Sequence, residues 1–91
     1  MTSQKFAGHE QAKARVEFYD DGSMALVSYS TMVIFVDNDG WLQVNGLYSR
    51  TTIRHIRWFM ECLRLSYQCA KDLYNDNMIM NIHTGEVKTR G

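Results

Sequence analysis

The chain has 91 residues, and its ten Lys and Arg residues balance its ten Asp and Glu residues, so the formal net charge is zero. A chain of this size builds one hydrophobic core and excludes a second domain. An apolar fraction of 45% excludes the composition of a disordered chain. Zero net charge gives no overall electrostatic attraction to nucleic acid or membrane, so binding to either needs a local basic patch. We expect a single domain over residues 1–91.

Neither a membrane segment nor a disulfide is expected. No apolar run reaches the ~18 residues that span a bilayer, and the amino end lacks the apolar segment of a secretory signal. We therefore expect a cytoplasmic protein with no membrane partner. Cys62 and Cys69 lie two helical turns apart, which is too far for a disulfide between them. The three histidines have no metal-ligand spacing, and we expect neither a metal nor a cofactor.

The first half of the chain predicts an antiparallel meander. Residues 1–13 are polar and aperiodic, and we expect a flexible or irregular amino-terminal arm. Residues 15–19 alternate as a strand with one wet face, and the Asp-Gly pair that follows favours a hairpin. Residues 24–37 are rich in β-branched and aromatic side chains, either as one bent strand or as two strands divided near residues 28–31. A second turn at residues 38–40 leads to a strand at 41–45.

The second half predicts one long helix. From Thr51 the apolar period becomes helical, at Ile53, Ile56, Met60, Leu63, Tyr67, Ala70 and Tyr74. Residues 78–89 alternate again, as a last strand or a short hairpin through Thr84 and Gly85. The expected fold class is α+β: a small antiparallel β-meander of three to five strands packed against one long α-helix.

A second apolar line lies on the opposite side of the predicted helix. The amino-terminal arm or the carboxy-terminal segment can cover it, or another copy of the chain can do so. We expect a homo-oligomer that uses Trp58 and Leu65, because a small chain gains core by association. His55 lies close to this line and is expected in the interface or in packing rather than in catalysis. The predicted oligomer or partner interface is Trp58, Cys62, Leu65, Cys69 and His55.

A third line on the helix is mostly basic, running through Arg50, Arg54, Arg57, Glu61, Arg64, Gln68 and Lys71. One interpretation is a solvated face in which Glu61 pairs with its neighbours. The other interpretation is an anion site, because a guanidinium group binds phosphate or carboxylate through two parallel hydrogen bonds. A helix cap needs one hydroxyl where "YSRTT" offers three, and the first turn holds no acid to complement the helix dipole. The predicted anion-binding set is Ser49, Arg50, Thr51, Thr52, Arg54, Arg57 and Arg64.

Motifs of catalysis are absent from the sequence. There is no Gly-rich phosphate loop, the "DNDG" stretch at residues 37–40 lacks the remaining ligands of a calcium loop, and no local triad exists. We therefore expect a binding protein and not an enzyme.

One stretch resembles an uncharacterised family of small bacteriophage proteins, which has a Tyr-Ser-x-Thr-Thr-x-x-His motif before a helix. This resemblance implies a phage setting and brings no established activity, cofactor or catalytic residue. Small phage proteins of this kind often act against host defences. The expectation is a counter-defence protein in the host cytoplasm that inhibits an immune effector or sequesters a phosphate-bearing signal. The matching residues are Ser28, Tyr29, Thr31, Val33, Leu42, Val44, Tyr48, Ser49, Thr51, Thr52 and His55.

Two other functions stay open at this stage. A small nucleic-acid-binding module would use the basic line along a backbone and stack bases on Trp58, Tyr48 or Trp41. A structural or assembly protein would use the basic line only to keep the helix soluble.

Overall fold

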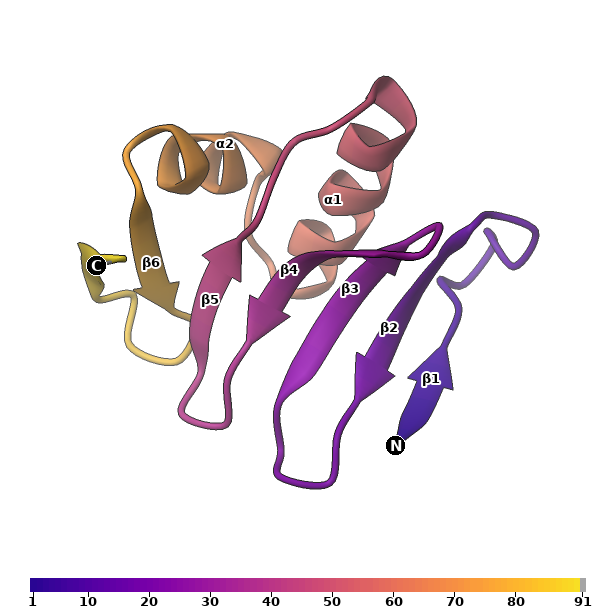
Figure 1. The fold of residues 1–91 in the computed structure, drawn as a ribbon, viewed down its shortest axis with the longest axis horizontal. Helices are drawn as coiled ribbons and strands as arrows, with labels where there is room; N and C mark the ends of the chain where they lie inside the picture. The colour runs from indigo at the N-terminus through magenta and orange to yellow at the C-terminus, as the bar shows by residue number, and fades with distance from the viewer. Residues whose placement is uncertain (91) are drawn as a thin grey trace.

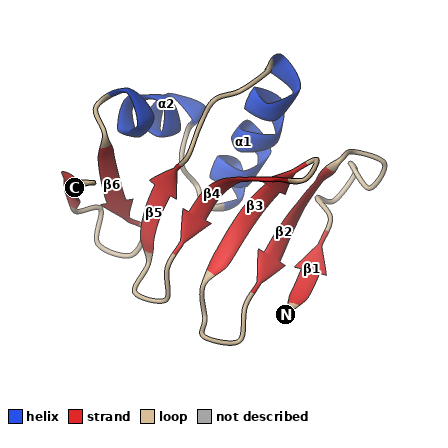
Figure 2. Cartoon of the chain, viewed as in Figure 1, coloured by secondary structure: helices blue, strands red, loops and turns tan. Residues whose placement is uncertain are grey.

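A computed structural model describes residues 1–90 of the chain and shows one sheet with two helices (Figures 1 and 2). All seven strands form a single antiparallel sheet whose spatial order is the chain order. The two helices are inserted between the fifth and the sixth strand. The elements are β1 Thr2–Gln4, β2 Ala14–Phe18, β3 Met24–Ser28, β4 Thr31–Val36, β5 Trp41–Val44, α1 Arg50–Cys62, α2 Tyr67–Asn75, β6 Met78–Asn81 and β7 Val87–Thr89.

The strands follow one another through short turns. The long apolar stretch divides into β3 and β4 at Tyr29 and Ser30, so the interpretation with two strands is the correct one. Gly22 (φ 91°) and Gly40 (φ 96°) occupy left-handed positions in the turns after β2 and β4, where glycine avoids the steric cost of a Cβ. The end of the chain forms a hairpin of β6 and β7 through Gly85. The two termini therefore lie at opposite edges of the sheet (Figure 1).

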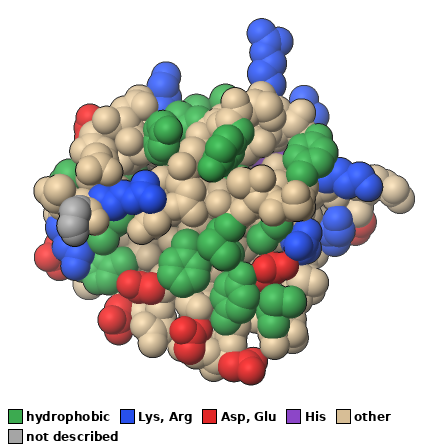
Figure 3. Space-filling view, in the orientation of Figure 1, with side chains coloured by type: hydrophobic (Ala, Val, Ile, Leu, Met, Phe, Trp, Pro, Cys, Tyr) green, Lys and Arg blue, Asp and Glu red, His purple; other side chains and the backbone are tan. Residues whose placement is uncertain are grey.

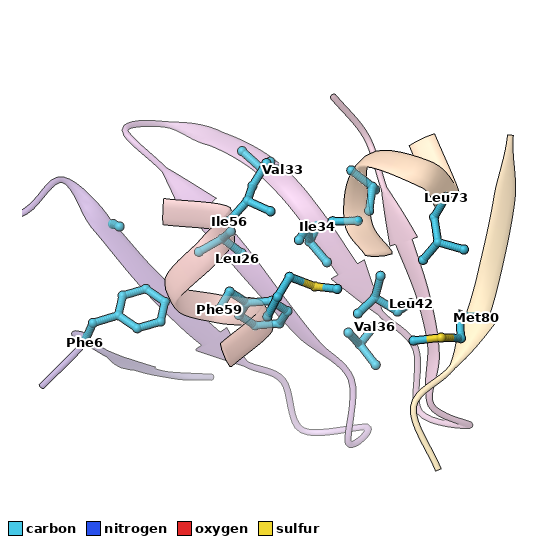
Figure 4. Packing of buried hydrophobic residues seen from close by; sticks show 14 residues of the cluster. Phe6, Leu26, Val33, Ile34, Val36, Leu42, Ile56, Phe59, Leu73 and Met80 are labelled. Carbon is cyan, nitrogen blue, oxygen red and sulfur yellow. The ribbon is translucent and has the colours of Figure 1, made fainter. Parts of the chain in front are cut away.

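Both helices pack on the same face of the sheet and enclose the core (Figure 4). Leu26, Ile34 and Val44 are opposite one another across β3, β4 and β5, and all three are buried. Ile56 of α1 and Leu73 of α2 belong to the same cluster. Since side chains alternate along a strand, every second residue of these strands points away from the helices. That opposite face has no covering layer within residues 1–90.

The predicted fold class is wrong: residues 1–90 form seven strands and two short helices, not three to five strands against one long helix. Helix α1 ends at Cys62, because Arg64 adopts a left-handed conformation (φ 60°). The Arg64 N–H donates to the Glu61 carbonyl and the Leu65 N–H to the Met60 carbonyl, which together form a Schellman termination. Glycine usually marks this position. An arginine there gave no signal that the helix stops.

The first thirteen residues contain more structure than the arm expected from the sequence. β1 pairs with β2, with Gln4 opposite Val16, and Phe6 is part of the buried core. Lys5 donates from Nζ to the Ala12 carbonyl at 2.7 Å and closes the loop between the two strands. A three-residue strand without apolar alternation is too short to be recognised from its pattern.

Candidate anion-binding site

The amino end of α1 is capped by a single hydroxyl. Ser49 is the N-cap residue, and its Oγ accepts from the Thr52 N–H at 3.2 Å. The same Oγ donates to Thr52 Oγ1 at 3.2 Å. The first turn contains no acidic residue. Its remaining N–H groups therefore keep the partial positive charge of a helix amino end without a negative side chain to offset it.

A buried polar network fastens this helix end to the sheet. Ser28 Oγ, at the end of β3, hydrogen-bonds with His55 Nδ1 at 2.7 Å and lies 3.4 Å from Thr52 Oγ1. Ser28 and His55 are each only 2% exposed. Burial, followed by the positive charges of Arg54 and Lys5, lowers the pKa of His55 below its usual value. The imidazole is therefore neutral at pH 7. This network positions the helix and leaves Thr52 and His55 enclosed by the protein.

Tyr29 stands next to this network in a strained conformation. Its φ of 58° is left-handed, which costs a residue with a Cβ about 1–2 kcal/mol. Hydrogen bonds hold it there: its N–H donates to the Lys13 carbonyl at 2.7 Å, and Arg15 Nη1 donates to its carbonyl at 3.4 Å. Its ring lies 6.1 Å from the His55 ring, centre to centre, and the side chain is 55% exposed. The turn thus presents an aromatic ring beside the amino end of α1.

Basic side chains from three segments gather at this end of the molecule. Arg50 and Arg54 are exposed on the first turns of α1. Lys13, exposed just before β2, lies at the same end of the sheet, but next to the buried Ala14 its side chain belongs to the side away from the helices. Lys5 contributes from the loop after β1, since its charge and that of Arg54 both act on His55. Within residues 1–90, none of these four forms an ion pair with a carboxylate. The positive charge at this end is therefore available to an anion from solution.

The predicted anion-binding residues do not all come together. Ser49, Arg50, Thr51 and Arg54 lie at the start of α1. Arg57 lies about 10 Å further along the helix axis than Arg50, and its guanidinium lies 5.9 Å from the centre of the Tyr67 ring of α2. Arg64 lies beyond the end of α1. The basic line predicted along one helix is thus divided between two places.

The second apolar side of α1 is covered from within the chain. The Trp58 ring stacks on the His9 ring at 3.9 Å with an interplanar angle of 15°, and the Phe6 ring lies 5.8 Å away. The amino-terminal segment therefore provides the cover, which was one of the alternatives considered above. With His55 buried as well, these two residues of the predicted interface are engaged inside the protein.

Of the other three residues of the predicted interface, Cys62 follows Trp58 by one turn as the last residue of α1, whereas Leu65 and Cys69 lie beyond the end of this helix and do not continue the line. Cys62 is exposed, whereas Leu65 and Cys69 are half-buried against the core. Cys69 Sγ lies 3.9 Å from Met80 Sδ. Burial, with a smaller contribution from the Asp72 charge, raises the pKa of the Cys69 thiol and disfavours its reactive thiolate form.

The side chains proposed for base stacking are unequally available. Trp58 is already stacked, and the Lys88 ammonium lies 4.1 Å from the centre of the Trp41 ring. Tyr48 is exposed and its ring lies over Gly46, where a Cβ would collide with the ring atoms. Tyr29 is exposed too. Of these rings, the exposed ones, Tyr29 and Tyr48, thus lie close to the start of α1 in the chain or in space.

The sequence analysis did not assign a role to Lys5, Lys13, Ser28 or Tyr29. Two of them, Ser28 and Tyr29, belong to the first half of the stretch that carries the family resemblance. Ser28 contacts Thr52 and His55 of its second half, and the Tyr29 ring lies near the His55 ring. The presence of both halves in one motif could therefore have indicated that β3 and α1 contact each other. The lysines gave no local signal, and Lys5 comes near His55 of α1 only through the pairing of β1 with β2.

Fold and site together define a small antiparallel-sheet protein with a basic, partly aromatic end. The chain belongs to the family described as Family of unknown function (DUF8033), whose model matches residues 2–78. The match covers β1 to the start of β6 and includes the whole candidate site. No curated protein and no solved structure matches the chain. Within residues 1–90, no helix has the length and hydrophobicity to cross a membrane, and no cluster of His, Cys, Asp and Glu can hold a metal ion.

Proposed function

We propose that the protein is a non-enzymatic binding protein that takes a phosphate-bearing ligand, or an anionic segment of a partner protein, at the amino end of α1. The observation that supports this most strongly is the pair Arg50 and Arg54, which lack carboxylate partners within residues 1–90 on a first turn without acids. Free N–H groups and guanidinium forks are the donors that bind phosphate in proteins.

The rigidity of the surroundings also favours binding. Ser28 and His55 fix the start of α1 against β3 through a buried hydrogen bond, so the backbone N–H groups of the first turn do not need to be ordered when the ligand arrives. The exposed ring of Tyr29 offers a flat apolar surface beside them. A ligand with both a phosphate and a planar group, such as a nucleotide, matches this combination.

The biological setting that we propose is phage counter-defence in the cytoplasm of the host. It is supported by the resemblance of the Tyr-Ser-x-Thr-Thr-x-x-His stretch to small bacteriophage proteins. In this setting the protein sequesters a phosphate-bearing signal or blocks the charged surface of an immune effector. Either action needs stoichiometric binding and no turnover.

A second candidate is a small nucleic-acid-binding module, which is favoured by basic groups from several elements around the exposed Tyr29 and Tyr48. Its affinity for a long single strand would fall steeply with salt, because each neutralised phosphate releases counterions. A site for one small ligand contacts few phosphates and depends less on salt. Titration of a fluorescent oligonucleotide at two salt concentrations distinguishes the two candidates.

Native mass spectrometry tests the proposed function on protein purified at low salt from cells that carry the natural ligand. We expect the unmodified protein to retain a small phosphate-bearing molecule and the Arg54→Glu variant to lose it. Arg57→Glu is the matched control, because it makes the same change on the same helix at a guanidinium that lies over the Tyr67 ring of α2. Retention by Arg54→Glu, or equal loss from both variants, would contradict the proposal.

A further inference from the structure

The face of the sheet that points away from the helices is apolar in its middle. Ala25 is 0% exposed and Val27 is 5% exposed on this face, although no helix covers them. Phe35 stands opposite Ala25 on the next strand. The charges of Arg15 and Glu17 cancel, since the two side chains form an ion pair at 3.0 Å. Figure 3 shows hydrophobic side chains gathered across the middle of the molecule over the strands.

One end of this face is acidic. β2, β4 and β6 run in the same direction, so the turns that follow them lie at the same end of the sheet. These turns contain no Lys or Arg, and Figure 3 shows acidic side chains along the corresponding lower edge. The acidic residues of the turns are Asp20, Asp21, Asp37, Asp39 and Glu86. Two cations lie at the same end, the amino-terminal ammonium, which pairs with Asp20 at 3.3 Å, and Lys88 over the Trp41 ring, so the end keeps a net negative charge.

The other end of the same face is basic. Arg90 Nη1 donates to the Val44 carbonyl at 3.0 Å, and Nη2 donates to Asn45 Oδ1 at 3.1 Å, which places the guanidinium where β5 ends. Lys13 precedes β2 at this end and is exposed. Neither forms an ion pair within residues 1–90. Although the net charge of the chain is zero, negative and positive charges are thus concentrated at opposite ends of the strands.

We propose that this face is the interface of a homodimer, in which two copies pack sheet on sheet with their strands antiparallel. A two-fold axis perpendicular to the strands places the acidic turns of each copy over the basic end of the other. An axis parallel to the strands would oppose like charges. A nucleic acid on this face would meet the five carboxylates of the turns, whereas a second copy matches the charge at both ends. The apolar middle provides the buried area, as between the layers of a sandwich.

This proposal does not depend on the proposed function, since Arg50 and Arg54 lie on the helix that packs on the other face of the sheet. It replaces Trp58 as the expected centre of self-association, because Trp58 is covered by the amino-terminal segment. It also predicts the effect of salt. An antiparallel dimer weakens as ionic strength rises, whereas a parallel one would tighten.

Sedimentation velocity over a concentration series tests the interface. We expect the unmodified chain to dimerise and Phe35→Glu to raise the dissociation constant at least about tenfold, as expected for a central interface residue. Met32→Glu provides a second variant on the partly exposed rim, in case Phe35→Glu disturbs folding. Lys71→Glu, which changes an exposed residue of α2, is the control and leaves the constant within about twofold. A monomer at all concentrations, or a dimer that both glutamate variants leave intact, would overturn the proposal.

Cross-linking with a carbodiimide tests the orientation, because this reagent joins a lysine to a carboxylate without a spacer. Lys13 and the turn holding Asp39 lie at opposite ends of the strands, roughly 15–20 Å apart for strands of this length, so a link between them joins two chains. In a mixture of isotopically light and heavy protein, we expect cross-linked peptide pairs in which one peptide is light and the other is heavy. A dimer that forms links only within one copy would exclude the antiparallel arrangement.

Discussion

Replacing Ser28 with alanine removes the hydroxyl that joins the sheet to the start of α1. In the protein, Ser28 Oγ bonds with His55 Nδ1 at 2.7 Å, while the 3.4 Å contact to Thr52 is long and contributes little. Ser28→Ala leaves a buried imidazole nitrogen without a partner, which costs about 1–3 kcal/mol. We expect a loss of about 2 kcal/mol in the free energy of unfolding. The corresponding fall in Tm is about 10 °C for a domain of this size.

Urea unfolding at pH 7.5 measures this loss, with the fluorescence of Trp58 as the signal, because its ring lies 5.3 Å from that of His55. Ser30→Ala is the matched control: it removes an exposed hydroxyl from the adjacent turn, and we expect a change within about 0.5 kcal/mol. A double-mutant cycle with His55→Phe isolates the bond and should give a coupling above about 0.5 kcal/mol. If Ser28→Ala costs no more than Ser30→Ala, the buried network does not hold the helix to the sheet.

Three further predictions concern pH and the helix ends. Because folding lowers the pKa of His55, the unfolded chain takes up its proton near the usual value of 6.5 and the folded chain only at lower pH. The contribution of His55 to the free energy of unfolding is therefore complete above pH 6.5 and decreases as the pH falls from there towards the pKa of the folded state. We expect Tm to decrease between pH 7.5 and pH 5, and to decrease less in the His55→Phe variant. Ser49→Ala and Ser66→Ala each remove an N-cap and should each cost about 1 kcal/mol in urea unfolding, with additive effects; a negligible loss in either would contradict the capping roles. Arg64→Gly relieves the left-handed strain at the end of α1 and should leave the free energy of unfolding unchanged or raise it by up to about 1 kcal/mol, whereas a clear loss would contradict the Schellman termination.

The local pattern of the sequence predicted the middle of the sheet well. Alternating apolar residues and the turns with Gly22 and Gly40 place β2 to β5 close to where they lie, because each signal depends on neighbours in the chain. The Ser49 cap was also predictable, since a hydroxyl before a helical period is a local signal.

The errors have a common physical origin in contacts between distant segments. Leu63 and Leu65, between α1 and α2, pack on the same core as the two helices, so the apolar periodicity continues through them. Periodicity alone therefore cannot show that the helix ends there. β1 is defined by its pairing with β2 and has no pattern of its own.

Isothermal titration calorimetry with pyrophosphate measures whether the proposed site at the amino end of α1 binds a phosphate-bearing anion. Pyrophosphate is titrated at low salt into the unmodified protein, Arg54→Glu and the matched Arg57→Glu. The account predicts saturable binding of one anion per chain, weakened about tenfold or more by Arg54→Glu, since a charge-assisted hydrogen bond contributes about 1.5–3 kcal/mol. It also predicts that Arg57→Glu changes the affinity by no more than about twofold. Absence of saturable binding, or equal weakening by both variants, would contradict it.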